Sequence, residues 1–290
     1  LSADGVDFTR FTTVHNARDA VDLMRAMGLA TWDLYAVSYG TRVALEIVRR
    51  EPGVLRSAVL DSVYPPQVNA ELSEPWLLQR ALGLFTRICQ LADDCEASPA
   101  DLESVLDAAF ARVARERLRL SVRDPDDGSD LAVVYDRDDL AWLLFEAMYQ
   151  WDAIPELPDS LRALADGRLD ADLRDLIQES DDAMLDDSIS DPIASSVDCH
   201  DAGPVDAGAM QLELDRYPDA GEIKRLDWEY HACRFWQSGY ADAAFRAPVV
   251  SAVPTLLLAG EFDPVTPPQW AEMAERHLAR AFLFVFPAIG

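Results

Sequence analysis

The first 61 residues alternate between amphipathic segments and short apolar runs. Apolar residues recur at helical spacing over residues 17–27, and Gly28 follows where a helix-ending glycine is expected. Trp32–Val37 is a short, mostly apolar run typical of a buried strand. A second helix is predicted over residues 41–50 and a second buried strand over residues 55–60. The order helix, strand, helix, strand indicates a parallel α/β unit.

Helical stripes dominate the middle of the chain. Apolar residues repeat at helical spacing over residues 102–113 and 140–148, and residues 161–176 also read as a helix. Acidic loops separate these stripes. Between residues 66 and 250 we expect no strand apart from a weak one at residues 131–135. This region is therefore predicted to be a mostly helical insertion.

Strand signals return near the C-terminal end. Residues 254–260 and Ala281–Phe286 are apolar runs, and residues 268–279 between them read as a helix. The predicted organisation is an α/β core formed by residues 1–64 and 251–290, with residues 65–250 inserted as a helical lid.

Acidic residues strongly outnumber basic ones. The 290 residues are 50% hydrophobic and include 52 acids against 25 bases, for a net charge of −27. Nucleic acid and anionic membrane surfaces need clustered Lys and Arg, so neither is an expected partner. The acids are spread along the chain, which favours a solvated surface over a device that attracts cationic substrates. No apolar run reaches the about 18–20 residues that span a bilayer, so no membrane insertion is expected, and no leader peptide follows Leu1.

The four cysteines do not decide between an oxidising and a reducing cellular compartment. Cys89, Cys95, Cys199 and Cys233 form no CxxC pair and have no metal-ligand spacing, so neither a metal site nor a cofactor is predicted. The pairing of near neighbours is Cys89–Cys95 with Cys199–Cys233; the alternative is four reduced thiols. Two disulfides would favour a secreted or periplasmic location, and reduced thiols a cytoplasmic one.

A candidate nucleophile lies where the first predicted strand turns into a helix. Ala36-Val37-Ser38-Tyr39-Gly40 has a serine flanked two residues away by small residues, as a nucleophile elbow requires. The usual GxSxG pattern has glycine where Ala36 stands, and we expect the extra methyl group to be tolerated. In this turn the backbone N–H of Tyr39 would point at the reacting centre as an oxyanion donor.

A serine nucleophile also needs an acid and a base, in the chain order Ser, acid, His. Asp263 directly follows a late strand and is the candidate acid; its alternative role is a turn aspartate before Pro264. Glu261 is a weaker alternative, and Asp61 is interpreted as structural.

None of the four histidines stands after the last strand, where the base belongs. His277 is expected in the middle of a helix, and His15 precedes the first predicted helix. His200 and His231 each lie near a cysteine and are interpreted as structural residues.

Three segments resemble the α/β-hydrolase family of proline iminopeptidases and secreted tripeptidyl aminopeptidases. They are LYAVSYGTR at residues 34–42, VLDSVYPP at 59–66 and PTLLLAGEFDPVTP at 254–267. Cys199-His200-Asp201 and the segment CRFW at residues 233–236 resemble two further segments of the tripeptidyl branch. The resemblance implies an α/β-hydrolase fold, with a doubly wound parallel sheet and a helical lid that contains a disulfide.

The same resemblance implies roles for particular residues. Ser38 would be the nucleophile and Asp263 the acid, and the family's base would be the residue directly after Gly290. Several strands and a His-Gly-Gly oxyanion loop precede the equivalent of Phe11 in the family. We therefore expect a chain truncated at both ends and inactive as it stands, because losing one oxyanion donor alone costs about 10²–10³ in rate.

The lid residues suggest a substrate class. Members that remove N-terminal residues bind a free ammonium, and Asp198 and Asp201 are the candidate lid carboxylates; solvated surface acids are the alternative. Trp236, with its aromatic neighbours in the lid, could line an apolar pocket or pack as lid core.

The predicted function is a serine aminopeptidase that acts on a peptide or small ester substrate. An esterase or thioesterase on the same fold is the first alternative, because the elbow does not distinguish amide from ester. A non-catalytic hydrolase-like binding protein is the second. The oligomeric state is not predicted.

Overall fold

The chain forms two compact units. The computed structural model describes residues 5–87, 99–150, 153–185, 190–203, 205–217 and 232–289. Unit 1 comprises Leu1–Pro75 and Ser190–Pro287, and unit 2 comprises Trp76–Ile189 and Ala288–Gly290. Residues 190–250, which the sequence places in the lid insertion, thus belong to the same unit as the sheet.

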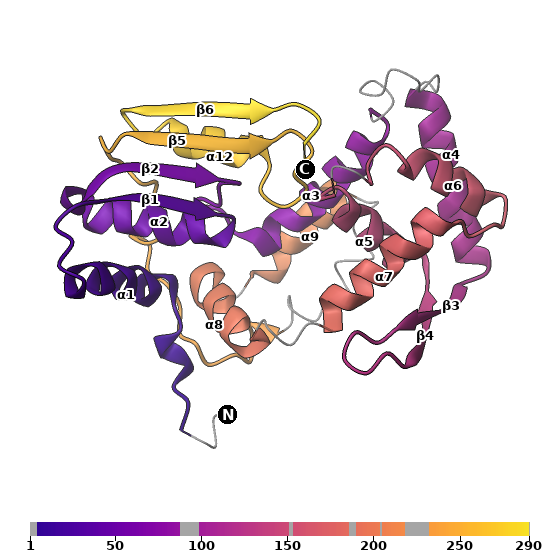
Figure 1. Cartoon of the computed structure of the whole chain (residues 1–290), viewed down its shortest axis with the longest axis horizontal. Helices are drawn as coiled ribbons and strands as arrows, with labels where there is room; N and C mark the ends of the chain where they lie inside the picture. The colour runs from indigo at the N-terminus through magenta and orange to yellow at the C-terminus, as the bar shows by residue number, and fades with distance from the viewer. Residues whose placement is uncertain are drawn as a thin grey trace. The chain divides into compact units, whose positions relative to one another are not determined.

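Unit 1 is built on a four-stranded parallel sheet (Figure 1). Its strands are β1 (Trp32–Val37), β2 (Leu55–Asp61), β5 (Thr255–Gly260) and β6 (Ala281–Phe286), in the order β1-β2-β5-β6. All four were predicted from their apolar runs. Because the strands are parallel, their carboxyl ends share one edge of the sheet.

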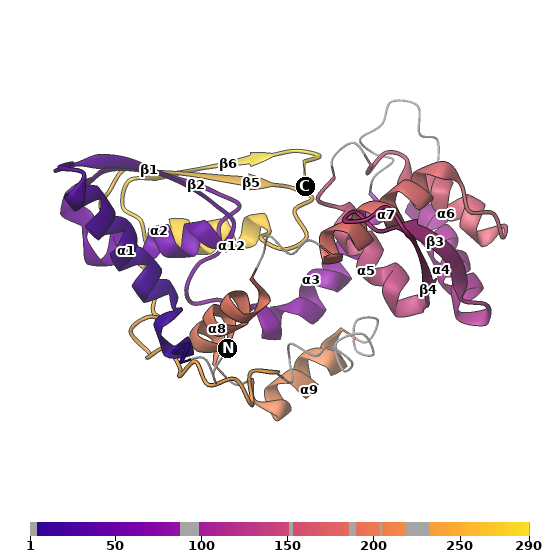
Figure 2. The same cartoon turned by 60° about the horizontal axis from the view of Figure 1, so that its bottom comes forward.

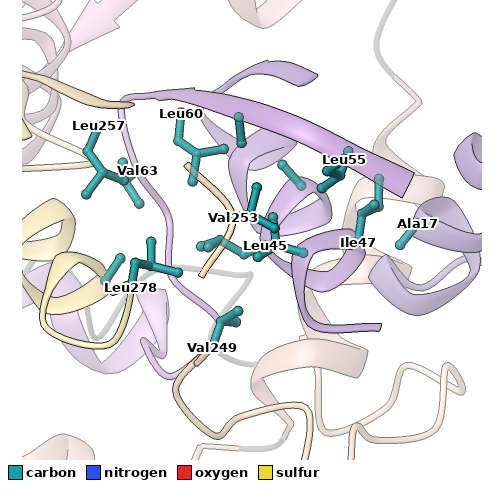
Figure 3. Packing of buried hydrophobic residues seen from close by; sticks show 14 of the residues in the cluster. Ala17, Leu45, Ile47, Leu55, Leu60, Val63, Val249, Val253, Leu257 and Leu278 are labelled. Atoms are coloured by element: carbon teal, nitrogen blue, oxygen red, sulfur yellow. The ribbon is translucent and has the colours of Figure 1, made fainter. Parts of the chain in front are cut away.

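One face of the sheet is covered by helices α1 (Thr13–Ala26), α2 (Tyr39–Arg50) and α12 (Pro268–Glu275), as Figure 2 shows. A core cluster fills this interface. Leu60 and Leu257 project from the strands toward residues such as Leu45 of α2 and Leu278, which follows α12 (Figure 3). Burial of these side chains, each worth about 1.5–3 kcal/mol, fixes the helices against the sheet.

The opposite face of the sheet carries exposed apolar side chains. Tyr35 of β1 is 65% exposed, and Phe282, Phe284 and Phe286 of β6 are 74%, 54% and 40% exposed. Exposed positions alternate with less exposed ones along β1 and over the first four residues of β6, so these side chains lie on the face away from the helices. Within the described residues of unit 1, therefore, only one of the two faces that a doubly wound sheet buries is covered by helices.

Helices α8 (Asp191–Ala202) and α9 (Ala207–Arg216) also belong to unit 1. Gly203 ends α8 with a φ of 71°, a backbone conformation that favours glycine. The Cys199–Cys233 disulfide, one of the pairings considered from the sequence, is present, with a Cα–Cα distance of 4.9 Å. The other pairing, Cys89–Cys95, lies outside the described residues.

Unit 2 is largely helical, as predicted, but it also contains a β-hairpin. Its described elements are α4 (Pro99–Arg115), β3 (Leu118–Arg123), β4 (Asp130–Tyr135), α5 (Arg137–Ala147), α6 (Leu157–Ala165) and α7 (Ala171–Leu185), while α3 (Ala70–Phe85) runs across the unit boundary. The expectation of no strand but residues 131–135 was wrong, because β3 pairs antiparallel with β4. Alternation of leucine and valine with polar residues gives β3 a half-exposed pattern.

Two predicted helices end earlier than expected. Residues 161–176 are divided between α6 and α7 because Gly167 adopts a φ of 81° between them. Helix α12 ends at Glu275, so His277 lies in the turn before β6 rather than inside a helix. Over the described ranges, no helix has the length and apolar character needed to cross a membrane.

Candidate active site

Ser38 lies in a strained turn at the carboxyl edge of the sheet. It directly follows β1 and precedes α2, with φ 52° and ψ −126°. A positive φ is uncommon for a non-glycine residue and is characteristic of a nucleophile elbow. The side chain is exposed, and the Ser38 N–H donates to the Asp61 carbonyl oxygen at 2.9 Å. The structure thus gives Ser38 the backbone geometry that the motif predicts.

The turn is braced by its neighbours. The Thr41 hydroxyl donates to the Ser38 carbonyl oxygen at 2.6 Å and accepts from the Tyr64 N–H at 2.8 Å. A Cβ placed on Gly40 would lie 3.7 Å from the Cβ of Ala36, which is an ordinary van der Waals contact. Alanine at position 36 is therefore accommodated beside a glycine at position 40.

Asp263 follows β5 at the same edge of the sheet and is buried, at 2% exposed. Its Oδ1 accepts from the N–H groups of Val265 and Thr266 at 2.9 and 2.7 Å, and its Oδ2 accepts from the Thr266 hydroxyl at 2.6 Å. These bonds organise the turn that leads into α12 and hold the carboxylate in one orientation. A carboxylate fixed in this way can orient a histidine, and it also serves as the turn aspartate considered from the sequence.

No histidine among the described residues hydrogen-bonds to Ser38. His15 Nδ1 lies 2.8 Å from the Thr12 hydroxyl, and His200 Nδ1 lies 3.0 Å from Asp201 Oδ1. His277 precedes β6, at the amino ends of the strands and so at the opposite edge from Ser38. His231 lies outside the described residues.

Asp201 is part of a buried polar network beside the elbow. It is 2% exposed, and its Oδ2 accepts from the Thr13 hydroxyl at 2.6 Å and lies 3.7 Å from Arg42 Nη1. The Arg42 guanidinium stacks on the Tyr64 ring, 3.6 Å from its centroid. The Asp201 side chain therefore points into the protein, and the sequence had no means of identifying a partner 188 residues away.

Asp198, one helical turn before Asp201 in α8, lines a small acidic cavity. The cavity, of about 50 Å³, is also lined by Glu71, Asp191 and the Cys199–Cys233 disulfide. The pKa of Asp198 is raised to about 6, mainly because surrounding protein displaces water from its carboxylate. Asp198 is nevertheless an exposed residue, so water also reaches it and screens its charge.

Trp236 is half-buried and contacts two other segments of unit 1. Its indole N–H donates to the Ser196 hydroxyl at 2.8 Å, and its ring lies 5.5 Å from the Phe8 ring. It thus joins α8 to the 3₁₀ helix Phe8–Arg10. Its aromatic neighbour Phe235 is 81% exposed, while Trp228 and Tyr230 lie outside the described residues.

The sequence analysis missed three residues beside the elbow. Thr13 and Asn16 of α1 both contact the Tyr39 phenol, and Arg42 of α2 contacts Asp201. The available signal was the burial expected of residues on the core face of each helix, which marks Arg42 as a buried charge that needs a partner.

One family model matches the chain. Residues 223–290 match the model described as TAP-like protein (Abhydrolase_4). No curated protein gives a significant match.

Solved structures of α/β hydrolases are similar to the chain at low sequence identity. A proline iminopeptidase from Mycobacterium smegmatis is 15% identical, with a TM-score of 0.41 over 98% of this chain and 67% of that one. A proline iminopeptidase-related protein from Thermus thermophilus is 21% identical, with a TM-score of 0.37 over 98% and 65%. An alpha/beta hydrolase enzyme from a Medee basin deep-sea metagenome library is 14% identical, with a TM-score of 0.38 over 96% and 64%. The chain thus spans about two thirds of the length of these structures.

The fold class predicted from the sequence is confirmed. The chain has the parallel sheet and the serine at a strained strand-to-helix turn that characterise an α/β-hydrolase fold. The family-model match over residues 223–290 agrees with this fold.

Proposed function

We propose that the protein containing this chain is a serine hydrolase in which Ser38 is the nucleophile. The observation that carries the proposal is the positive φ of an exposed serine between β1 and α2. Such strain is retained only where the surrounding structure over-determines it, and it clusters at functional sites.

The proposed reaction is acyl transfer. Ser38 Oγ attacks the substrate carbonyl carbon and loses its proton to a base, and the backbone N–H of Tyr39 stabilises the resulting oxyanion. The base returns the proton to the leaving amine or alcohol, and water then hydrolyses the acyl-enzyme by the same steps. Asp263 orients the base. We propose, from the family resemblance, that this base is a histidine directly after Gly290.

We further propose that the substrate is a peptide with a free N-terminus. The Asp198 carboxylate, in a cavity with Glu71 and Asp191, would accept hydrogen bonds from the substrate ammonium group. Asp201 is not part of this site because its side chain is fully buried. An aminopeptidase of this kind, with the Cys199–Cys233 disulfide, fits a secreted or periplasmic location.

The pH dependence of substrate binding tests the role of Asp198. The groups that act on its pKa are Arg42, which lowers it, and Asp201 and Glu71, which raise it together with burial. Because its pKa is about 6, the carboxylate becomes charged as pH rises through 6. We therefore expect the KM for a free-amine peptide anilide to fall between pH 5 and about pH 7, while the substrate amine remains protonated.

The N-acetylated peptide anilide and a short ester are the matched substrates, assayed on the full-length protein. Asp198→Asn should raise the KM for the free-amine peptide about tenfold at pH 7 and leave the acetylated substrate unchanged. Equal turnover of free and acetylated peptides at every pH would exclude the aminopeptidase and leave an endopeptidase or esterase. Turnover of esters alone would identify an esterase.

A further inference from the structure

The side chain of Tyr39 is fixed by a chain of hydrogen bonds that runs away from the elbow. Its phenol oxygen lies 2.9 Å from the Thr13 hydroxyl and accepts from the Asn16 amide at 2.9 Å. The Thr13 hydroxyl in turn donates to Asp201 Oδ2 at 2.6 Å. These residues come from α1, α2 and α8, and they meet beside the first turn of α2.

We call the hydrogen-bonded chain Tyr39–Thr13–Asp201 the relay. The chemistry of its groups decides which of them donates in each hydrogen bond. Asp201 only accepts, so the single proton of the Thr13 hydroxyl points at Asp201. Thr13 can then only accept from Tyr39, so the phenol donates to Thr13. Burial raises the pKa of the Tyr39 phenol, which keeps that proton in place.

At the far end of the relay, Asp201 has two further partners, His200 and Arg42. Asp201 Oδ1 accepts from His200 Nδ1, which therefore carries the ring proton, and Oδ2 also faces Arg42. Arg42 donates from Nη2 to the carbonyl oxygens of Pro65 and Val68 at 3.2 and 2.6 Å. Thr13, Arg42 and Asp201 are 0%, 1% and 2% exposed, so removing one partner leaves a buried polar group unsatisfied.

We propose that Asp201 and Thr13 are positioning residues. Through the phenol of Tyr39 they hold the backbone N–H of Tyr39, the oxyanion donor, in place beside Ser38. This inference rests on the proposed function, because it assigns the backbone N–H of Tyr39 to the oxyanion. The phenol anchors Tyr39 on the residue next to the strained Ser38 backbone. Without that anchor the first turn of α2 is free to relax, and the N–H moves off the oxyanion.

Hydroxyl deletions along the relay test the inference in the full-length protein. Thr13→Val and Tyr39→Phe should each lower kcat about 10- to 100-fold with KM changed less than twofold, because a misdirected donor loses much of its stabilisation of the transition state. Thr13→Ser keeps the hydroxyl and should retain nearly full kcat.

Thr255→Val is the matched control. It removes a buried hydroxyl that donates to the Val253 carbonyl oxygen. Thr255 is the first residue of β5, at the amino edge of the sheet, whereas the elbow lies at the carboxyl edge. This variant should therefore leave kcat unchanged. Circular dichroism and denaturant unfolding establish that each variant is folded. If Thr13→Val does not fold, Tyr39→Phe and Thr13→Ser decide the question.

The possible results separate two failures. If Ser38→Ala abolishes turnover but folded Thr13→Val or Tyr39→Phe keeps wild-type kcat, or changes only KM, the positioning role is refuted and the proposed function stands. A loss of kcat in Thr255→Val as large as in Thr13→Val also refutes it. If Ser38→Ala turns over substrate like the wild type, the proposed function fails and the inference fails with it.

Discussion

At the scale of single residues, the site depends on backbone geometry more than on side-chain identity. Ser38 was predicted from a five-residue motif at a strand–helix junction, and its positive φ agrees with that prediction. Asp201 was predicted as a ligand residue because its sequence neighbourhood resembles the lid of known peptidases. Its partners Thr13 and Arg42 are distant in the chain, so only the folded structure shows that its carboxylate is internal.

The space at the elbow predicts which substitutions it accepts. Gly40→Ala should keep activity within a few-fold, since its Cβ would meet Ala36 at an ordinary contact distance of 3.7 Å. Gly40→Val adds two further carbons against Ala36 and should lose most activity and about 1–3 kcal/mol of unfolding free energy. Activity assays and denaturant unfolding measure both effects.

Gly53→Val is the control for this pair, because nothing lies within 4 Å of a Cβ at Gly53. It should retain full activity. A Gly40→Val protein as active as Gly40→Ala would show that the turn is not spatially constrained.

At the scale of elements, continuous apolar runs were read correctly and alternating ones were not. The four sheet strands are dominated by apolar residues, which makes their signal unambiguous. In β3, Arg119 and Arg123 alternate with leucine and valine, so the strand has no continuous apolar run. Its pairing with β4 is set by contacts across a turn rather than by local composition. Helix ends were missed where one residue decides them, as at Gly167.

The disulfide that joins Cys199 of α8 to Cys233 is predicted to stabilise the protein. The Cys199–Cys233 bond closes a loop with a sequence separation of 34 residues, for which chain-entropy arguments give about 3–4 kcal/mol. Reduction should lower the unfolding free energy of the protein by about this amount, which urea unfolding with and without reductant measures.

The double variant Cys199→Ser, Cys233→Ser isolates this bond from the other cysteines. It should match the reduced wild type in stability, and reductant should have little further effect on it. Equal unfolding midpoints for the oxidised wild type and the double variant would contradict a stabilising role.

At the scale of the whole molecule, unit 1 combines a well-covered sheet face with one that is exposed. Parallel sheets are normally buried on both faces, and Phe282 and Phe284 stand uncovered in the described part of this unit. The hydrolase fold was predictable because helix–strand order and the elbow are local signals. The division into units at residues 75 and 190 was not, since it depends on long-range packing of α8 and α9.

The most direct test of the account is covalent labelling of the nucleophile. The full-length protein is incubated with a fluorophosphonate, which forms a bond from phosphorus to an activated serine oxygen with loss of fluoride, and the modified residue is identified by peptide mass spectrometry. The account predicts a single modification on Ser38, abolished in Ser38→Ala together with hydrolysis. Modification of another residue, or hydrolysis that persists in Ser38→Ala, would contradict it.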